Sequence, residues 1–345
     1  MSNVVSDVVS NVVPIIKVDR LAKTYPVALK EPGFVNTLRH FFKRRYRYIQ
    51  AVKPLSFTIE AGEMVGFLGP NGAGKTTTLK MLTGLIHPSG GSCRVSGFEP
   101  FRRDIPFLHQ ISLVMGQKQQ LIWDLPAIDS LKINGAIYGL SDREFRQRVG
   151  QLSEMLMLTD KLTQPVRKLS LGERMKAELL AALLHHPKIL FLDEPTLGLD
   201  VNAQMAVRQF LKDYNDRFQA TILLTSHYMA DITALCHRVL VIHEGQLIYD
   251  GLLDNLLEQF APWREVHLDL AKAEDLNAFQ LTPCAYGQVE SIEGLSVRLL
   301  LDRSMLTPTV SRLLADFKIL DLSISDPPIE EVIGRVFQQE SRSSS

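Results

Sequence analysis

The sequence predicts an α/β fold in which helices cover a mostly parallel sheet. Apolar stretches rich in β-branched residues alternate with segments whose apolar residues recur every three to four positions, a pattern typical of such sheets. The stretch Ile189–Leu192 is continuously apolar, as expected of a strand that is buried on both faces. The chain has 345 residues, more than one ordinary domain of about 100 to 200 residues, so we expect a second, smaller module.

Five short apolar stretches predict the strands of this sheet. They are Met64–Leu68, Ile111–Met115, Ile189–Leu192, Thr221–Thr225 and Val239–His243. Helical periodicity is clearest in Leu171–His186 and Val201–Phe218, which lie between predicted strands. A helix between two strands returns the chain to the same edge of the sheet, so neighbouring strands are expected to run parallel.

Residues 263–345 predict a small α+β domain that follows a main domain of residues 1–262. Strand-like stretches at Glu265–Leu270, Leu295–Leu301 and Ile319–Ser325 frame a helix-like stretch at Ser304–Phe317. A further helix is expected after Pro328, before a Ser-rich tail that frays.

An insertion of about residues 26–50 interrupts the first part of the main domain. It carries the basic residues Lys30, Arg39, Lys43, Arg44, Arg45 and Arg47, interleaved with Phe41, Phe42, Tyr46 and Tyr48. Basic side chains attract anionic lipid headgroups, and aromatic rings favour the membrane interface. The insertion is therefore expected either to touch a membrane surface or to be a solvated segment packed on its own domain.

The composition excludes several classes of protein. Lys and Arg number 38 and Asp and Glu number 38, with 46% hydrophobic residues, which disfavours a disordered chain and a strongly electrostatic nucleic-acid binder. The longest uninterrupted apolar run, Leu179–Leu184, is far shorter than the roughly 18 residues that a membrane-spanning helix needs. The 3 cysteines show neither paired nor metal-ligand spacing, so a reducing cytoplasmic setting is expected.

The segment GPNGAGKT matches the phosphate-binding pattern G-x-x-x-x-G-K-[ST]. It follows the predicted strand Met64–Leu68 and opens a helical pattern from Lys75 to Leu85, the context that supports the motif. Backbone N–H groups of such a loop and the positive end of the helix bind phosphate. Lys75 is expected to reach the β- and γ-phosphates, and Thr76 to ligate Mg²⁺. The residues expected around the phosphates are Gly69, Pro70, Asn71, Gly72, Ala73, Gly74, Lys75, Thr76 and Thr77.

Two carboxylates follow the apolar strand in ILFLDE. Strand ends of this kind carry the ligand sites of doubly wound sheets. Asp193 is suited to hold Mg²⁺, and Glu194 to accept a proton from the water that attacks the γ-phosphate.

The segment LSLGE contains an S-x-x-E pattern. Ser170 and Glu173 have the spacing of a helix capping box, which by itself indicates a helix start. The same geometry gives a second anion-binding surface made of Ser170, the N–H of Gly172 and the helix N-terminus.

The order of these motifs, from about Ile15 to Leu253, resembles that of the ATP-binding-cassette (ABC) ATPases. LSLGE resembles the signature sequence of that family, with Leu171 where a second glycine is more usual and Glu173 in place of glutamine. The resemblance implies a P-loop NTPase cassette with a mostly parallel core sheet, an antiparallel β subdomain and a helical subdomain. It also implies ATP and Mg²⁺ as ligands and hydrolysis of ATP.

The resemblance assigns further residues to the site. Gln117 resembles the switch glutamine that touches Mg²⁺ and the attacking water, and His227 resembles the histidine that contacts the γ-phosphate. Asp200 matches a loop that crosses the dimer interface, and it can also cap the helix that begins at Val201.

One aromatic residue is expected to stack on adenine. Tyr25 resembles it, with Tyr46 and Tyr48 as alternatives because the insertion follows Tyr25.

The family pattern places Ser170, Gly172 and Glu173 on the nucleotide of a second subunit, so a homodimer, or a dimer with a related cassette, is expected to hold two ATP molecules. Segments near His227 and Pro327 resemble cassettes that work with ABC type-2 permeases. The chain is thus expected to drive transport, with export favoured, through separately encoded membrane subunits at the cytoplasmic face of the membrane. Trp123, Leu125 and Ile128 are candidates for the groove that receives a permease helix, or for the core of a helical subdomain.

Two other functions remain to be weighed against transport. A soluble ABC ATPase that acts on nucleic acid or ribosomes would use the same motifs, although only a short stretch separates Lys75 from Asp193 and each motif occurs once. Nucleic-acid binding is not expected, because of that short separation and the single copy of each motif. A phosphate-loop kinase is the other alternative, but it would need neither LSLGE nor His227.

Overall fold

The computed structural model describes most of the chain, which divides into two compact units, Met1–Gly251 (unit 1) and Leu252–Ser345 (unit 2). The described residues are 13–28, 46–116, 119–226, 228–260, 263–281, 286–325 and 334. This division lies before the boundary that we expect between residues 262 and 263, because helix α9 (Leu253–Phe260) is grouped with unit 2. The expected helix after Pro328 lies outside the described residues.

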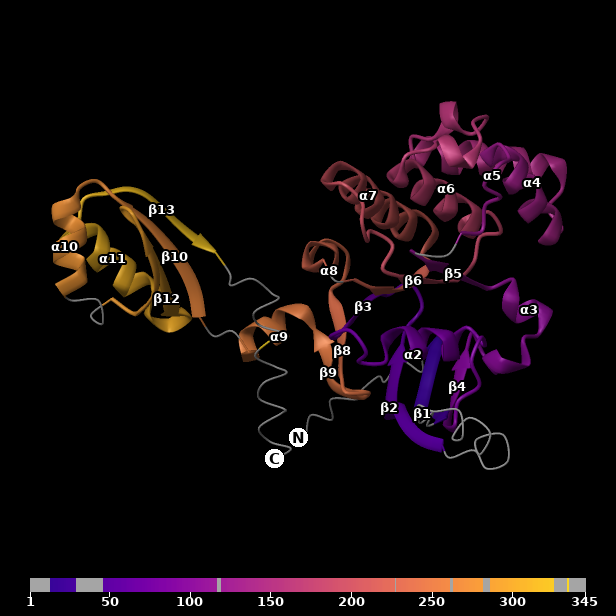
Figure 1. Cartoon of the computed structure of the whole chain (residues 1–345), viewed down its shortest axis with the longest axis horizontal. Helices are drawn as coiled ribbons and strands as arrows, with labels where there is room; N and C mark the ends of the chain where they lie inside the picture. Colours follow the sequence, from indigo (N-terminus) through magenta and orange to yellow (C-terminus); the bar gives the residue numbers. More distant parts are fainter. Residues whose placement is uncertain are drawn as a thin grey trace, which may run out of the picture. The chain divides into compact units, whose positions relative to one another are not determined.

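Unit 1 is built on a six-stranded sheet in the order β5-β6-β7-β3-β8-β9 (Figure 1). The strands are β3 (Met64–Leu68), β5 (Ile111–Met115), β6 (Ile189–Asp193), β7 (Thr221–Thr225), β8 (Arg238–His243) and β9 (Gln246–Leu252). The four pairings among β5, β6, β7, β3 and β8 are all parallel, which confirms the predicted sheet. Four of these strands have almost no exposed residue, as their apolar sequences predict.

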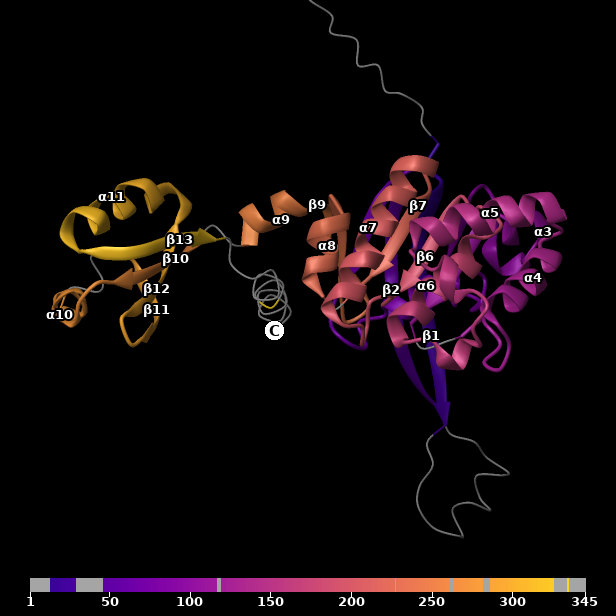
Figure 2. The same cartoon turned by 90° about the horizontal axis from the view of Figure 1, so that it is seen from above.

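A second, antiparallel sheet of unit 1 has the order β2-β1-β4. It consists of β1 (Ile16–Ala28), β2 (Tyr46–Ile59) and β4 (Gly90–Val95), and β1 and β2 form a long two-stranded ribbon (Figure 2). Residues 46–50, which we expected in the insertion, therefore belong to β2 and pair with β1. The rest of the basic-aromatic segment, residues 29–45, lies outside the described residues. One buried apolar cluster joins both sheets to the helix α2.

The helices of unit 1 fill the connections between the strands. They are α2 (Lys75–Leu82), α3 (Ile105–Leu108), α4 (Ala127–Ile137), α5 (Asp142–Met155), α6 (Leu171–Leu183), α7 (Val201–Phe218) and α8 (Met229–Leu235), with 3₁₀ turns at Pro100–Arg102, Thr159–Lys161 and Val166–Lys168. In Figure 1, α4, α5 and α6 gather on one side of the six-stranded sheet, opposite the antiparallel sheet. This arrangement matches the expected helical and antiparallel β subdomains.

Unit 2 alternates strands and helices around a four-stranded antiparallel sheet. The elements after α9 are β10 (Trp263–Leu270), α10 (Ala273–Leu281), β11 (Gln288–Glu293), β12 (Ser296–Asp302), a 3₁₀ turn at Arg303–Met305, α11 (Leu306–Asp316) and β13 (Ile319–Ser325). The strand order β11-β12-β10-β13, with this chain order, is a βαββαβ arrangement in which β12 lies between β10 and β11. The sequence did not predict β11 or α10, because the polar residues of β11 obscure its alternation.

No helix among the described residues combines the length and the apolar character needed to cross a bilayer. Cys93 and Cys236 are free and buried.

The core of unit 2 gives a test of whether the two units unfold independently. Phe279 has no exposed surface and contacts Tyr286 and Phe317 at ring-centroid distances of 5.9 and 5.7 Å. Phe279→Ala should lower the free energy of unfolding of unit 2 by about 3 to 5 kcal/mol, because it leaves a cavity. The chain has 2 tryptophans, Trp123 in unit 1 and Trp263 in unit 2. When one of them is replaced by Phe, the fluorescence of the other follows the urea unfolding of its own unit.

We expect only the Trp263 transition to move. An equal shift of both transitions would show that the two units unfold together.

Candidate nucleotide-binding site

The predicted phosphate loop connects β3 to α2, and its backbone requires glycine at two positions. Gly69 and Gly74 have φ angles of 151° and 108°, which side chains rarely allow. A Cβ on Gly69 would lie 2.2 Å from the carbonyl oxygen of Ile242, and one on Gly74 would lie 2.7 Å from that of Ala51. The loop is thus packed against β2 and β8 in a shape that side chains would prevent.

Lys75, the first residue of α2, lies within this loop. Its Nζ donates to the carbonyl oxygens of Gly69 at 2.5 Å and Pro70 at 3.0 Å, and only 6% of the residue is exposed. Burial lowers the pKa of Lys75, while the charges of Glu194 and Asp193 oppose that shift. The buried Lys75 ammonium group has lost most of its contact with water. A polyanion such as a triphosphate, bound at the helix N-terminus, would stabilise this charge.

Asp193 is the centre of a hydrogen-bonded cluster at the carboxyl ends of β6 and β7. Thr76 Oγ1 donates to its two carboxylate oxygens at 3.2 and 2.9 Å, and Thr225 Oγ1 donates to Oδ1 at 2.8 Å. Hydroxyl and carboxylate oxygens are the ligands that Mg²⁺ prefers, usually together with water and substrate phosphates. Of the three donors that the sequence predicts for the metal, Thr76 and Asp193 are therefore brought together in this structure, whereas Gln117 lies outside the described residues.

Glu194 has an unusual backbone conformation for a residue with a side chain. Its φ is 55°, and its N–H donates to the hydroxyl and the carbonyl oxygen of Thr225, both at 3.1 Å. Such left-handed conformations cost free energy and recur at functional sites. The bonds to Thr225 hold this backbone at the strand end, next to Asp193.

A polar cavity of about 260 Å³ lies at this edge of the sheet. It is lined by Thr76, Lys80, Met115, Gly116, Asp193, Glu194 and Leu197. The phosphate-loop helix, the end of β5 and both predicted carboxylates thus share one cavity. The described residues that line this cavity do not include Ser170 or Asp200.

Ser170 and Glu173 form the predicted capping box at the start of α6. Ser170 Oγ accepts from the Glu173 N–H at 3.2 Å, and the Glu173 carboxylate accepts from the Ser170 N–H at 2.9 Å. The bond from the Ser170 N–H and an ion pair with Lys161 at 3.1 Å lower the pKa of Glu173. Ser170 and Leu171 remain exposed, so this helix end is accessible.

Two other motif residues have clear structural roles. Gly172 is buried, and a Cβ there would lie 2.7 Å from Cβ of Ala203, so glycine allows α6 to approach α7. Asp200 caps α7 by accepting from the N–H of Ala203 at 2.9 Å, as predicted. Gln117 and His227 lie outside the described residues.

The register of the β1–β2 ribbon separates the three candidate adenine-stacking residues. Tyr25 pairs with Ile49, whereas Tyr48 and Tyr46 pair with Pro26 and Ala28. Because side chains alternate between faces along a strand, Tyr25 lies on the opposite face from Tyr46 and Tyr48. Tyr25 is half-buried, with Lys23 Nζ 5.1 Å from its ring centroid.

Several polar residues that support the site were not predicted from the sequence. Thr225 connects Asp193 and Glu194, and a hydroxyl at the end of a neighbouring parallel strand could have indicated it. Asp231 has no exposed surface and accepts from Thr196 Oγ1 at 2.5 Å, Ser226 Oγ at 2.6 Å and Arg208 Nε at 2.5 Å. No sequence motif marked this network, because its members come from four separate segments.

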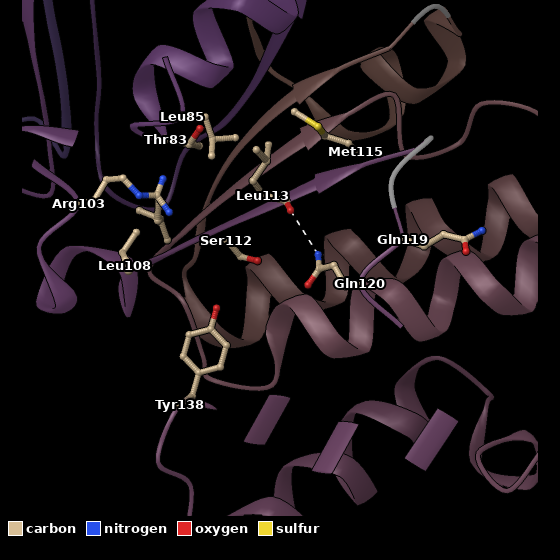
Figure 3. Close-up of a pocket in the computed structure, with 11 residues that line it drawn as sticks. Thr83, Leu85, Arg103, Leu108, Ser112, Leu113, Met115, Gln119, Gln120 and Tyr138 are labelled. Carbon is tan, nitrogen blue, oxygen red and sulfur yellow. Dashed lines mark hydrogen bonds between the residues drawn. The ribbon is translucent and has the colours of Figure 1, made fainter. Parts of the chain in front are cut away.

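A second, more apolar cavity of about 420 Å³ lies beside β5 (Figure 3). It is lined by Thr83, Leu85, Arg103, Leu108, Ile111, Ser112, Leu113, Met115, Gln119, Gln120 and Tyr138. The predicted groove residues Trp123, Leu125 and Ile128 are not among its described lining residues. Trp123 instead stacks on the Arg174 guanidinium, whose carbon lies 4.4 Å from the ring centroid.

Two family models match parts of the chain. Residues 52–197 match the ABC transporter family, and residues 262–325 match the C-terminal domain of EvrA-like ABC transporters. The ABC transporter ATP-binding protein NatA of Bacillus subtilis (strain 168) is 37% identical over 68% of this chain and 91% of its own length. The linearmycin resistance ATP-binding protein LnrL of the same organism is 28% identical over 84% and 94%. The Nod factor export ATP-binding protein I of Burkholderia lata is 39% identical over 63% and 70%.

Solved structures share the fold of the cassette. The ATP-binding subunit of an ABC transporter superposes with a TM-score of 0.58 at 25% identity, covering 71% of this chain and 93% of that one. The dimeric cassette MJ0796 bound to ADP and Pi superposes with a TM-score of 0.57 at 23% identity, covering 69% and 98%. The chain therefore belongs to the ABC transporter ATP-binding proteins, as an ATP-binding and ATP-hydrolysing cassette with the P-loop fold and an additional C-terminal domain.

Proposed function

We propose that Glu194 activates water at a Mg²⁺·ATP site built on Lys75, Thr76 and Asp193. The observation that carries this proposal is the Asp193 cluster, in which Thr76 and Thr225 hydrogen-bond one carboxylate directly before Glu194. Thr76 and Asp193 would hold Mg²⁺, which supplies charge neutralisation on the phosphates when bound. Glu194 accepts the proton of the attacking water.

The nucleotide site is completed by other residues of the motifs. The N–H groups of Gly69 and of residues 71–77 bind the β- and γ-phosphates together with Lys75, since Pro70 has no N–H group. Gln117 contributes to metal and water binding, and His227 to the γ-phosphate. Tyr25 stacks on adenine; Tyr46 and Tyr48 lie on the opposite face of the ribbon and cannot share its position.

The signature serine acts on a second subunit in this proposal. Ser170 is exposed at the N-terminus of α6 and does not line the cavity of its own Glu194 among the described residues. Exposed apolar side chains nearby, Leu171, Val201 and Met205, suit a surface that becomes covered. A homodimer, or a dimer with a related cassette, would place Ser170, Gly172, Glu173 and Asp200 at the neighbour's nucleotide. The cassette MJ0796, which has the same fold and is a dimer with ADP and Pi bound, supports this arrangement.

The cassette dimer drives transport through separately encoded permeases at the cytoplasmic face of the membrane. Relatives named for Nod factor export and linearmycin resistance favour export. The apolar cavity with Leu85, Leu113 and Tyr138 would receive a cytoplasmic helix of the permease. Action on nucleic acid is not favoured, because the relatives are transporter proteins and the net charge is +0.

The role of Glu194 can be tested by a change that keeps its shape. Glu194→Gln should leave ATP binding intact and slow hydrolysis by about two to four orders of magnitude, because the amide cannot accept the proton. Phosphate release measures turnover, and equilibrium dialysis with ATP measures binding. Glu154→Gln, an exposed change on α5, is the matched control and should retain full turnover. Turnover of the Glu194 variant at the control rate would exclude Glu194 as the base.

A mixed dimer tests the trans geometry. One subunit carries Lys75→Met and the other Ser170→Ala, so in trans both lesions fall in one site and the second site keeps all its groups. We expect ATP binding with wild-type affinity at one of the two sites, measured by titration calorimetry on tandem-tagged mixed dimers. If each site is instead damaged once, Ser170 serves the nucleotide of its own subunit.

The docking cavity can be tested with a charge at its rim. Leu85 lines the cavity and is 51% exposed, so Leu85→Asp should abolish co-sedimentation with membranes of the source cell while hydrolysis in solution continues. The reason is that docking would bury an unpaired carboxylate. The control is Met157→Asp, which places the same charge on another exposed apolar side chain, 83% exposed, that does not line the cavity. This variant should co-sediment normally with the membranes. Normal co-sedimentation of the Leu85 variant would place the membrane contact elsewhere.

A further inference from the structure

The connection that leaves β5 borders both the polar cavity of Asp193 and Glu194 and the apolar cavity beside β5. Met115 lines the polar cavity of Asp193 and Glu194 and also the apolar cavity. Gly116 lines the polar cavity, while Gln119 and Gln120 line the apolar one (Figure 3). Described residues at each end of this connection therefore form part of the wall of one or both cavities.

The start of the connection is tied closely to the carboxylates. The Gly116 N–H donates to the carbonyl oxygen of Asp193 at 3.0 Å. A Cβ on Gly116 would lie 2.6 Å from the carbonyl oxygen of Glu194, so the two backbones are in direct contact. Gly116 therefore contacts the backbone of both Asp193 and Glu194.

The far end of the connection is held by a buried glutamate of α6. Glu178 is 4% exposed, and its carboxylate accepts from the N–H of Gln120 at 3.1 and 2.9 Å and from the N–H of Leu121 at 3.2 Å. A carboxylate is rarely buried without such bonds, because its desolvation is costly. One turn earlier, Arg174 stacks on Trp123, which gives α6 a second contact with the same segment.

We propose that Glu178 is a positioning residue for ATP hydrolysis, which holds the connection after β5 so that Gly116 and Met115 form the wall of the Asp193–Glu194 cavity. The inference rests on the proposed function of that cavity. Through Glu178, this cavity wall is joined to α6, the helix whose N-cap is Ser170. Glu178 does not touch the reacting atoms, and it acts through the two N–H groups that it binds.

The test compares Glu178→Gln and Glu178→Met with a stability control on the same helix. The amide keeps one acceptor oxygen and the thioether leaves both N–H groups unpaired, so the two changes loosen the connection to different degrees. Leu180→Ala removes a fully buried side chain of α6 that takes no part in these bonds. It should lower the melting temperature without changing turnover per folded molecule.

We expect Glu178→Gln to lower kcat by about tenfold and Glu178→Met by more, since displacement of a reacting arrangement by an ångström can cost about a hundredfold. KM for ATP and the affinity for ATP without Mg²⁺ should stay within about twofold, because the phosphate loop is unchanged. The Mg²⁺ concentration for half-maximal activity should rise. Hydrogen exchange at the amides of Gln120 and Leu121 should accelerate, while the amides of β6 stay protected.

Three outcomes would overturn the inference. They are wild-type kcat in both Glu178 variants, an equal loss of kcat in Leu180→Ala at matched melting temperature, and unchanged exchange at Gln120 and Leu121. Glu194→Gln in the same assay separates this result from the proposed function. Continued turnover of Glu194→Gln contradicts the proposed function, whereas its loss together with normal Glu178 variants contradicts only the role of Glu178.

Discussion

The Asp193 carboxylate, hydrogen-bonded by Thr76 and Thr225, is the interaction on which the arrangement of the site depends. It joins the helix after the phosphate loop to the ends of two neighbouring parallel strands. Because the strands are parallel, their carboxyl ends meet at one edge, and loops that are distant in sequence converge there. The Thr225 hydroxyl, which donates to Asp193, also accepts from the N–H of Glu194, the residue with a positive φ.

Buried polar residues extend this arrangement beyond the cavity. Asp231 joins the segments of Thr196, Ser226 and Arg208, and Glu178 joins α6 to the connection after β5. Each is a charged group removed from water, so breaking its bonds leaves donors or acceptors unpaired in the interior.

The two units have different kinds of interior. Unit 1 packs a parallel sheet, an antiparallel sheet and α2 into one apolar cluster. Unit 2 covers its antiparallel sheet with α10 and α11, and its aromatic residues Phe279, Tyr286 and Phe317 lie together in the core. The hydrogen bond from Tyr286 to Asp316, at 2.7 Å, satisfies the one polar atom of that aromatic group and raises the pKa of Tyr286.

The sequence by itself determined the elements whose signals are local. The strands Met64–Leu68, Ile111–Met115 and Thr221–Thr225 and the helix Val201–Phe218 have the predicted bounds, because continuous apolar runs and helical spacing are properties of neighbouring residues. The phosphate loop, the Asp193–Glu194 pair and the capping box were also predicted, since each motif occupies a few consecutive positions. Only the tertiary structure decided that Thr225 joins the two carboxylates, that Tyr25 faces away from Tyr46 and Tyr48, and that Glu178 holds the connection after β5. Those contacts join residues far apart in sequence, and strand order, register and helix packing bring them together without leaving a pattern in the sequence.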